Sequence, residues 1–119
     1  MDIKLSEDQL EMVRQARRFC ENELPMTRTR EVVEGKHTFT DADWQKMVGL
    51  GWSALLIPEA YGGVGMALLD MALILQEMGR TVAPGPLFST VLLGAGVIAE
   101  AGSEAQKQHY LSAVAEGKL

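Results

Sequence analysis

The sequence has little of what marks several common protein classes. Its one cysteine, Cys20, cannot form an internal disulfide, which excludes the disulfide-stapled domains that many small secreted proteins use. Basic residues are outnumbered, with 11 Lys and Arg against 16 Asp and Glu and a formal net charge of −5. A nucleic-acid-binding protein needs a basic face that displaces counterions from phosphates, so we expect no nucleic-acid partner.

Long apolar runs are also missing. No stretch approaches the roughly 20 apolar residues that a membrane-spanning helix needs, so we expect no insertion into a membrane. The first ten residues alternate charged and apolar side chains, a pattern that fits neither a signal peptide nor a transit peptide. Together with the lone Cys20, this pattern predicts a cytoplasmic protein.

What is present fits one globular domain. Of the 119 residues, 47% are hydrophobic and 23% are charged, and area scaling predicts that folding hides roughly two-thirds of the unfolded chain's surface. Apolar spacing and capping signals predict an all-α fold of about five helices in an orthogonal or bundle-like arrangement, as one domain over residues 1–119. The short run 54–57 is the only candidate strand, and it is too short to build a sheet.

Three of the expected helices begin with a hydroxyl side chain that can cap the helix, followed three residues later by a side chain that can bond back to the backbone. These pairs are Ser6 with Gln9, Thr40 with Asp43, and Ser103 with Gln106. The first helix is expected to end near Pro25. The polar residues 27–38 then predict a helix extension that frays into an exposed connection.

Two further expected helices are apolar almost all round. One covers 68–78, with Gly79 as its expected C-cap, and the other covers 87–101. Such helices are buried on more than one side, so each lies at the centre of the bundle or is covered by something outside this chain. Gly94 and Gly96 weaken the second helix by about 1 kcal/mol each. They indicate close approach of another helix or a ligand, or else a tolerated structural feature.

Candidate chemistry is sparse. His37 and His109 lie far apart, with no cysteine or carboxylate at a metal-ligand spacing, so we interpret them as solvated and assign no metal site. Cys20 lies on the apolar face of the first helix with only Arg17 as a neighbouring cation, which favours a small hydrophobe over a reactive thiol. The glycines after Pro58 lack the Lys-Ser/Thr pair of a nucleotide-binding loop, which favours an ordered turn over a phosphate cradle. No catalytic residue emerges.

Several segments resemble one family, in the same order along the chain. They are 5–9, 49–52, 57–65, 76–79 and 102–107, with Tyr110, Leu111 and Gly117 after them. Together they resemble the N-terminal domain of acyl-CoA dehydrogenases over essentially the whole chain. The Pro-Glu-x-Tyr-Gly-Gly loop that begins at Pro58 is the most specific piece.

The resemblance implies a function for a longer protein. In that family the helical domain precedes a middle β-domain and a C-terminal four-helix bundle, and FAD is held chiefly by those two and by a neighbouring subunit. A glutamate removes a proton from the carbon α to the thioester while hydride leaves the β carbon for the flavin, giving a trans-2-enoyl-CoA. Because that glutamate belongs to the C-terminal part, the resemblance implies no catalytic and no cofactor-binding residue here, and the chain alone is expected to be inactive.

The resemblance also implies partners. These are an acyl-CoA substrate, the remaining dehydrogenase domains or a homologous subunit, and electron-transfer flavoprotein as the electron acceptor, in an enzyme that is a homo-oligomer at full length. The apolar helices are then expected to meet the missing domains, leaving an exposed apolar patch on this chain.

One wall of the acyl pocket is implied at the start of the helix over 87–101, at Pro86, Ser89, Thr90 and Leu93. An apolar helix with two hydroxyls near its beginning suits such a wall, although simple core packing explains each residue equally well. The segment 80–88 departs from the fatty-acid enzymes and resembles a bacterial branch that acts on steroid, dicarboxylic or aromatic-derived acyl-CoAs, so the acyl class stays open.

Two other interpretations remain. In the first, the chain is a stand-alone helical binding module, derived from the same domain, that pairs with a separate flavin-carrying chain or acts as an interaction protein. Otherwise it is a small helical regulator unrelated to the family, in which case the loop motif is a coincidence.

Overall fold

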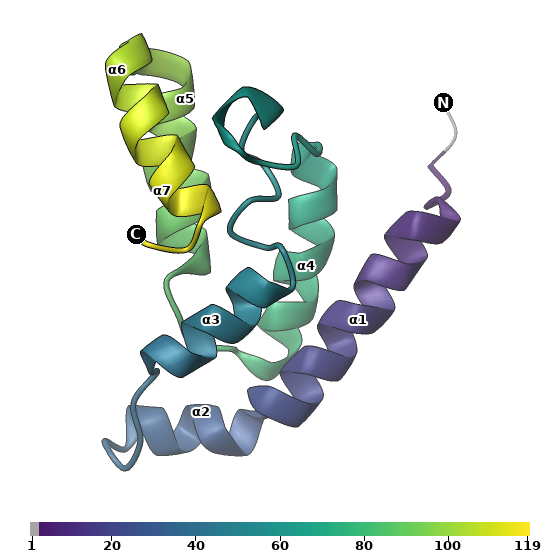
Figure 1. Ribbon diagram of the computed structural model, residues 1–119. Coiled ribbons are helices and arrows are strands. Elements are labelled where there is room, and N and C mark those ends of the chain that lie inside the picture. Colours follow the sequence, from purple (N-terminus) through teal and green to yellow (C-terminus); the bar gives the residue numbers. More distant parts are fainter. Residues whose placement is uncertain (1–2) are drawn as a thin grey trace. The chain divides into compact units, whose positions relative to one another are not determined.

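The computed structural model describes residues 3–119; Met1 and Asp2, which belong to the N-terminal segment interpreted above, lie outside the described residues. Within that range the chain is helical and contains no strand, which confirms the all-α fold class. It forms two compact units (Figure 1). The first contains the residues up to Thr38 and Ala72–Pro84, and the second contains Phe39–Met71 and Gly85–Leu119.

Six helices run through residues 3–119, one more than the five expected. In chain order they are α1 (Glu7–Glu23), α2 (Met26–Val33), α3 (Asp41–Gly49), α4 (Leu68–Thr81), a continuous helix made of η2 (Phe88–Ala95) and α5 (Gly96–Ala101), and another made of α6 (Glu104–Gln106), η3 (Lys107–Leu111) and α7 (Ser112–Ala115). The segments η2 and η3 are π-helical, which means that each turn is one residue wider than in an α-helix. A short 3₁₀ turn, η1 (Glu59–Tyr61), follows α3.

The three predicted helix starts are confirmed. At Ser6, the hydroxyl accepts a hydrogen bond from the Gln9 amide over 3.1 Å, and the Gln9 side chain accepts one from the Ser6 amide over 2.9 Å. The same reciprocal pair of bonds begins α3 at Thr40 and the last helix at Ser103. Each box satisfies two backbone groups that a helix end otherwise leaves without a partner.

The prediction of a helix extension that frays into an exposed connection over residues 27–38 was right about the helical stretch and the exposed connection, but wrong in treating the helix as part of the first one. The first helix does end just before Pro25, but Pro25 then serves as the N-cap of a separate helix, α2. The side chain of Thr29 on α2 is buried and donates a hydrogen bond to the backbone carbonyl of Thr81 over 3.2 Å, within the first unit. A polar residue therefore anchors α2, which the apolar pattern of the sequence did not show.

The predicted end of α4 was also wrong. Gly79 lies inside the helix, which continues to Thr81 and is closed by Val82 in the left-handed region at φ 51°. The Ala83 amide donates to the Met78 carbonyl over 2.9 Å, and the Val82 amide donates to the Gly79 carbonyl over 3.2 Å. This is a Schellman C-cap with valine where glycine is usual.

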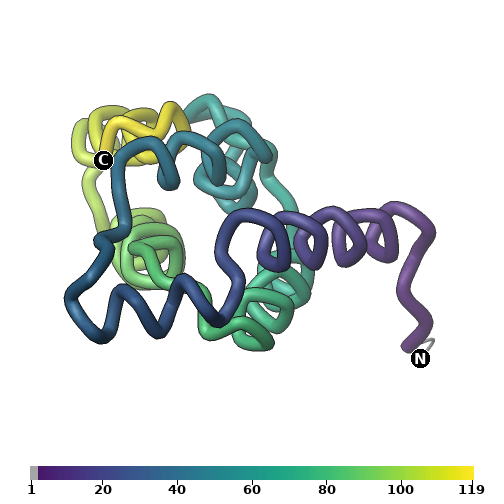
Figure 2. The backbone as a smooth tube through the Cα atoms, turned by 90° about the horizontal axis from the view of Figure 1, so that it is seen from below, coloured from purple at the N-terminus to yellow at the C-terminus, as the bar shows by residue number. Residues whose placement is uncertain are grey.

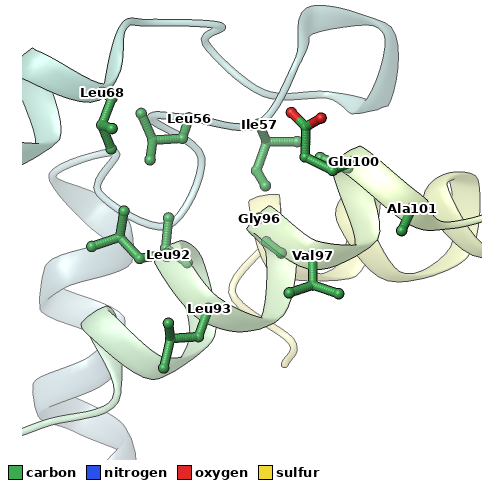
Figure 3. Close-up of a pocket in the computed structure, with 12 residues that line it drawn as sticks. Leu56, Ile57, Leu68, Leu92, Leu93, Gly96, Val97, Glu100 and Ala101 are labelled. Atoms are coloured by element: carbon green, nitrogen blue, oxygen red, sulfur yellow. The ribbon is translucent and has the colours of Figure 1, made fainter.

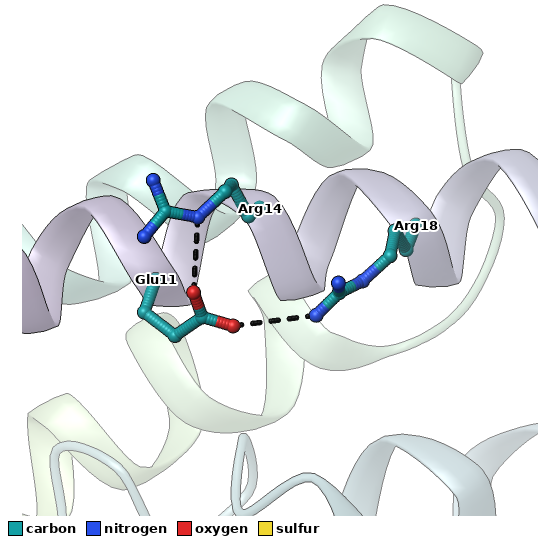
Figure 4. A network of polar contacts seen from close by, with 3 residues as sticks. All are labelled: Glu11, Arg14 and Arg18. Atoms are coloured by element: carbon teal, nitrogen blue, oxygen red, sulfur yellow. Dashed lines mark hydrogen bonds and ion pairs between the residues drawn. The ribbon is translucent and has the colours of Figure 1, made fainter.

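The core side of α1 follows a spacing of four residues. Ala16, Cys20 and Leu24 are each at most 1% exposed. On its solvent side, Glu11 bonds Arg14 over 2.9 Å and Arg18 over 3.3 Å (Figure 4). The hydrogen bond from Arg14 is the main cause that lowers the pKa of Glu11. All three side chains are exposed, so the network is a surface ion pair of small energetic weight.

In the second unit, α3 holds the last turn of the chain. The indole nitrogen Nε1 of Trp44 and the side-chain amide of Gln45 both donate to the Gly117 carbonyl, over 3.2 and 3.3 Å. The Ser53 hydroxyl donates to the Ala115 carbonyl over 3.3 Å. Figure 2 shows the end of the chain returning to the start of α3. Among residues 3–119, no helix is long and apolar enough to cross a membrane.

Candidate functional site

The backbone amides of the glycine-rich loop after Pro58 form hydrogen bonds to carbonyls of the same loop and of the segment before it. The amides of 62–66 all donate to backbone carbonyls within 54–59, at distances between 2.9 and 3.1 Å. A Cβ on Gly63 would lie 1.9 Å from the Ile57 carbonyl oxygen, so only glycine fits there. The amides that would cradle a phosphate are therefore already bonded, which confirms the ordered turn that the sequence favoured.

The loop is also tied to the start of the last helix. The Tyr61 hydroxyl donates a hydrogen bond to the Glu104 carboxylate over 2.9 Å. This bond is the main cause that raises the pKa of Tyr61, because it stabilises the protonated phenol. The loop and this contact fix the position of the backbone at Leu56 and Ile57.

Those two residues form one side of an apolar groove along η2 and α5 (Figure 3). The groove has a volume of about 690 Å³. It is lined by Leu56, Ile57, Leu68, Val91, Leu92, Leu93, Ala95, Gly96, Val97, Ala99, Glu100 and Ala101. Glu100 is the only charged lining residue, and Figure 3 shows its carboxylate next to Ile57.

The helix beside the groove has a core face and an outer face. Leu87, Val91 and Ala95, spaced four apart, are at most 3% exposed. Offset by two residues, Leu93 and Val97 are 54% and 65% exposed. Figure 3 shows both side chains pointing away from Leu56 and Leu68. The outer face is thus apolar and uncovered by residues 3–119.

The four residues predicted for the acyl wall are not all brought to one pocket. Leu93 lines the groove, whereas Pro86 and Thr90 line a second pocket with Trp44 of α3 and the last four residues of the chain. Ser89 lies exposed and lines neither. The Pro86 carbonyl accepts hydrogen bonds from the Thr90 amide over 2.8 Å and from the Ser89 hydroxyl over 3.1 Å. The Ser89 proton is therefore already donated to the backbone.

Sequence reasoning missed most of the groove. Leu56 and Ile57 belong to a segment whose apolar composition predicts burial. Nothing in the sequence connects them to a helix some 40 residues later. Glu100 carries no motif that singles it out. The predicted apolar patch is present, since Leu68, Leu93 and Val97 are more than half exposed and line one groove.

The two glycines of this helix are not explained by a neighbour in the described residues. A Cβ on Gly96 would meet nothing within 4 Å. A Cβ on Gly94 would meet only the Ser89 carbonyl of its own helix, at 3.4 Å. No other described segment lies within 4 Å of a Cβ on either glycine, so two explanations remain: a helix or ligand outside residues 3–119, or a tolerated structural feature.

The remaining candidates for chemistry are two histidines and one cysteine. His37 and His109 are exposed, and residues 3–119 contain no group of three side chains able to hold a metal ion. Burial raises the pKa of the Cys20 thiol to about 11, so the thiolate that would act as a nucleophile is scarce at neutral pH.

Comparison with known proteins gives the family. The sequence profile described as "Acyl-CoA dehydrogenase, N-terminal domain" matches residues 6–118. This chain belongs to the acyl-CoA dehydrogenase family. The match covers nearly all of the chain, so the family resemblance seen in the sequence is confirmed.

This dehydrogenase domain has relatives that are much longer. The human mitochondrial short-chain specific acyl-CoA dehydrogenase is 32% identical over 97% of this chain and 28% of its own length. Acryloyl-CoA reductase (NADH) of Anaerotignum propionicum is 29% identical over 98% of this chain and 29% of its own length. The solved structure of butyryl-CoA dehydrogenase from Megasphaera elsdenii matches with a TM-score of 0.79 and 29% identity, over 98% of this chain and 31% of that one. The chain therefore spans about three-tenths of these relatives.

Proposed function

We propose that the full-length protein is an FAD-dependent acyl-CoA dehydrogenase that oxidises an acyl-CoA thioester to the trans-2-enoyl-CoA. In this proposal the domain forms one wall of the acyl pocket and part of the surface that meets the other domains. Pro86, Ser89, Thr90 and Leu93 contribute to the wall. The catalytic base and the flavin belong to the rest of the enzyme, so this chain alone is inactive.

The observation that supports the wall most strongly is the exposed apolar outer face of the helix made of η2 and α5. Leu93 and Val97 present uncovered aliphatic side chains, and ligand sites are mainly apolar with few polar groups. Leu93 also lies on a π-helical stretch, and π-helical turns within helices are frequent at functional sites.

The flavin does not fit the apolar groove. Its diphosphate needs cationic side chains or free backbone amides, and the lining contains neither a lysine nor an arginine. The one charged lining residue, Glu100, would repel a phosphate. FAD, when bound elsewhere in the full-length enzyme, supplies the acceptor for the hydride. This chain's own contribution is to bind and orient the acyl chain and to keep water from it.

The test is acyl-chain selectivity in the full-length enzyme. Leu93→Trp is expected to lower kcat/KM for long acyl-CoAs about tenfold or more while leaving the shortest substrates much less affected, because added bulk shortens the pocket. The substrate panel includes straight-chain thioesters from propionyl-CoA upwards and steroid, dicarboxylic and aromatic acyl-CoAs, so it also reports the acyl class. Activity is followed with an artificial electron acceptor.

Leu69→Trp is the matched control, because Leu69 is also an exposed leucine but does not line the groove. It is expected to leave the selectivity unchanged. Equal effects of Leu93→Trp on all chain lengths would overturn the wall assignment. Oxidation of no acyl-CoA by the flavin-loaded enzyme would overturn the proposed function itself.

We further propose electron-transfer flavoprotein as the physiological acceptor, a homo-oligomeric full-length enzyme and a cytoplasmic location. One relative is named as a reductase that uses NADH, so NADH is the alternative electron carrier to test beside electron-transfer flavoprotein. Reduction of purified electron-transfer flavoprotein by enzyme and substrate, with no turnover of NADH, is the expected result. The reverse result would replace the proposed acceptor.

A further inference from the structure

The first unit gathers its exposed apolar side chains beside α2. Among residues 3–119 this unit exposes four large hydrophobic side chains, and one of them, Ile3, precedes α1. The other three, Met26, Val33 and Val82, are 40%, 83% and 60% exposed. They line a hollow of about 260 Å³, which we call the α2 hollow. Its lining consists of Met26, Thr29, Arg30, Val33, Glu34 and Val82. Such a gathering on a surface indicates an interaction site.

Val82 is held in a strained conformation in this lining. Its φ of 51° lies in the left-handed region, which a β-branched residue rarely adopts and which glycine adopts without strain. Because the side chain is 60% exposed, its burial within this chain does not offset the strain. Strained residues cluster at functional sites, and here the strain is associated with an apolar side chain at the α2 hollow.

The two charged residues of the α2 hollow have opposite signs. Arg30 and Glu34 are exposed and four positions apart, but they do not pair with each other. The Arg30 guanidinium lies 3.9 Å from the Met26 sulfur, and Glu34 pairs with Lys36. Among residues 3–119, Arg30 has no carboxylate partner.

We infer that the α2 hollow is a contact between two copies of this chain, in which α2 packs antiparallel against α2 of the second copy across a two-fold axis. A two-fold axis joins the same surface of both copies, so that surface must complement itself. Antiparallel helices place Arg30 opposite Glu34 of the second copy and Glu34 opposite its Arg30. A parallel pair would instead place Arg30 against Arg30. The antiparallel axis passes beside position 32, so the two Val33 side chains lie close together.

The pair of opposite charges favours a second copy over other occupants. Arg30, Val33 and Glu34 are spaced three and four apart, so they share one side of α2. A ligand or protein surface of one charge sign would leave either Arg30 or Glu34 facing a like charge or no charge. A second copy of the same surface pairs both.

The contact is one part of a larger interface. The helix α2 has eight residues, so it is about 12 Å long and covers far less than the roughly 1,200 Å² that a stable interface buries. Further contacts between the copies come from the rest of the full-length enzyme. The inference therefore rests on the proposed homo-oligomer, and it adds the surface and the register of one of its contacts.

The test is disulfide cross-linking of Val33→Cys in the full-length enzyme, with Val64→Cys as the matched control. Both valines are exposed, but Val64 does not line the α2 hollow. A mild oxidant is added to the native enzyme, and the covalent dimer is measured on a non-reducing gel, with the unmodified enzyme as the blank. Val33→Cys is expected to give at least about fivefold more dimer than Val64→Cys, at a yield that does not change on tenfold dilution.

Charge reversal in the Val33→Cys enzyme tests the register. Arg30→Glu alone and Glu34→Arg alone each place like charges opposite each other, so each is expected to lower the dimer yield severalfold. The two changes together restore complementary charges and are expected to restore the yield. Arg18→Glu, at an exposed arginine outside the α2 hollow, is the control and leaves the yield unchanged. Val82→Gly is expected to lower the yield, because it removes an apolar side chain from the contact.

Three results would overturn the inference. Equal yields for Val33→Cys and Val64→Cys, or a yield that falls with dilution, would mean that the cross-link forms by random collision. Single reversals that change nothing would remove the pairing of Arg30 with Glu34. Protection of Val33→Cys from a maleimide without any cross-link would assign the α2 hollow to another part of the same subunit.

Cross-linking needs no turnover, so its outcome is separate from that of the proposed reaction. An enzyme that cross-links but oxidises no acyl-CoA fails the proposed function and leaves this contact standing. An active enzyme that sediments as a monomer at every concentration overturns the contact and the homo-oligomer together and leaves the reaction standing.

Discussion

The Arg17 guanidinium forms a bidentate ion pair with the Glu77 carboxylate. The Nε and Nη2 atoms each donate to one carboxylate oxygen of Glu77, over 3.0 Å. Glu77 is 5% exposed, and Arg80 stands 3.5 Å away on the next turn of α4. The hydrogen bonds from Arg17 are the main cause that lowers the pKa of Glu77. A buried carboxylate is therefore kept ionised by a bidentate pair within the first unit.

The first prediction is that this pair makes stability depend on pH. The pKa of Glu77 is lowered on folding, so its contribution is present above its ordinary value of 4.5 and is lost as pH falls through the lower folded value. Glu77→Gln is expected to cost about 1–2 kcal/mol near neutral pH, discounted because the Arg17 side chain is half exposed. Urea midpoints of the two proteins should converge as the pH falls through the lowered folded pKa of Glu77. A difference that persists in acid would contradict the ion-pair account.

The second prediction concerns the left-handed cap of α4. A β-branched residue at φ 51° is strained, whereas the equivalent positions after α2, α3 and α7 are Gly35, Gly51 and Gly117, with φ between 71° and 83°. Val82→Gly is expected to stabilise the protein by about 1 kcal/mol, since the valine is also 60% exposed. The mirror variant Gly35→Val, with open space around it, should cost about as much. Thermal midpoints that fall for Val82→Gly would show that the side chain is needed.

A third prediction separates backbone strain from collision. Gly51 and Gly117 both have positive φ, but a Cβ on Gly51 would meet nothing, whereas one on Gly117 would lie 2.5 Å from Val48 Cγ2. Gly51→Ala is expected to cost about 1 kcal/mol and Gly117→Ala at least about 1–3 kcal/mol more. Chemical denaturation measures both. Similar costs would mean that the last turn can shift away from Val48.

The fourth prediction concerns Cys20. Burial raises its pKa to about 11, so near pH 8 roughly 0.1% of the thiol is ionised, and the side chain is 1% exposed. Reaction with a thiol reagent should be slower than for a free thiol by about three orders of magnitude or more and should become complete in urea. Fast labelling of the native protein would contradict both the burial and the raised pKa.

Helix starts and the main core stripe followed from the sequence because they depend on neighbouring residues. The capping boxes at Ser6, Thr40 and Ser103 join positions three apart, and the buried Ala16 and Cys20 repeat at helical spacing. Such contacts form within a segment whatever the rest of the chain does. The family motifs are local in the same sense, which is why the sequence was sufficient to indicate the family.

The end of α4, the existence of α2 and the groove were decided by the tertiary structure. Thr29 bonds the Thr81 carbonyl across 52 positions, which supports the last turn of α4 beyond the glycine that local propensity chose as its end. The groove joins Leu56 to Leu92 and Glu100, and the loop bonds that position Leu56 leave no periodic signal. Contacts between distant segments depend on how side chains pack in three dimensions. The local sequence around either residue of such a pair does not indicate which residue it contacts.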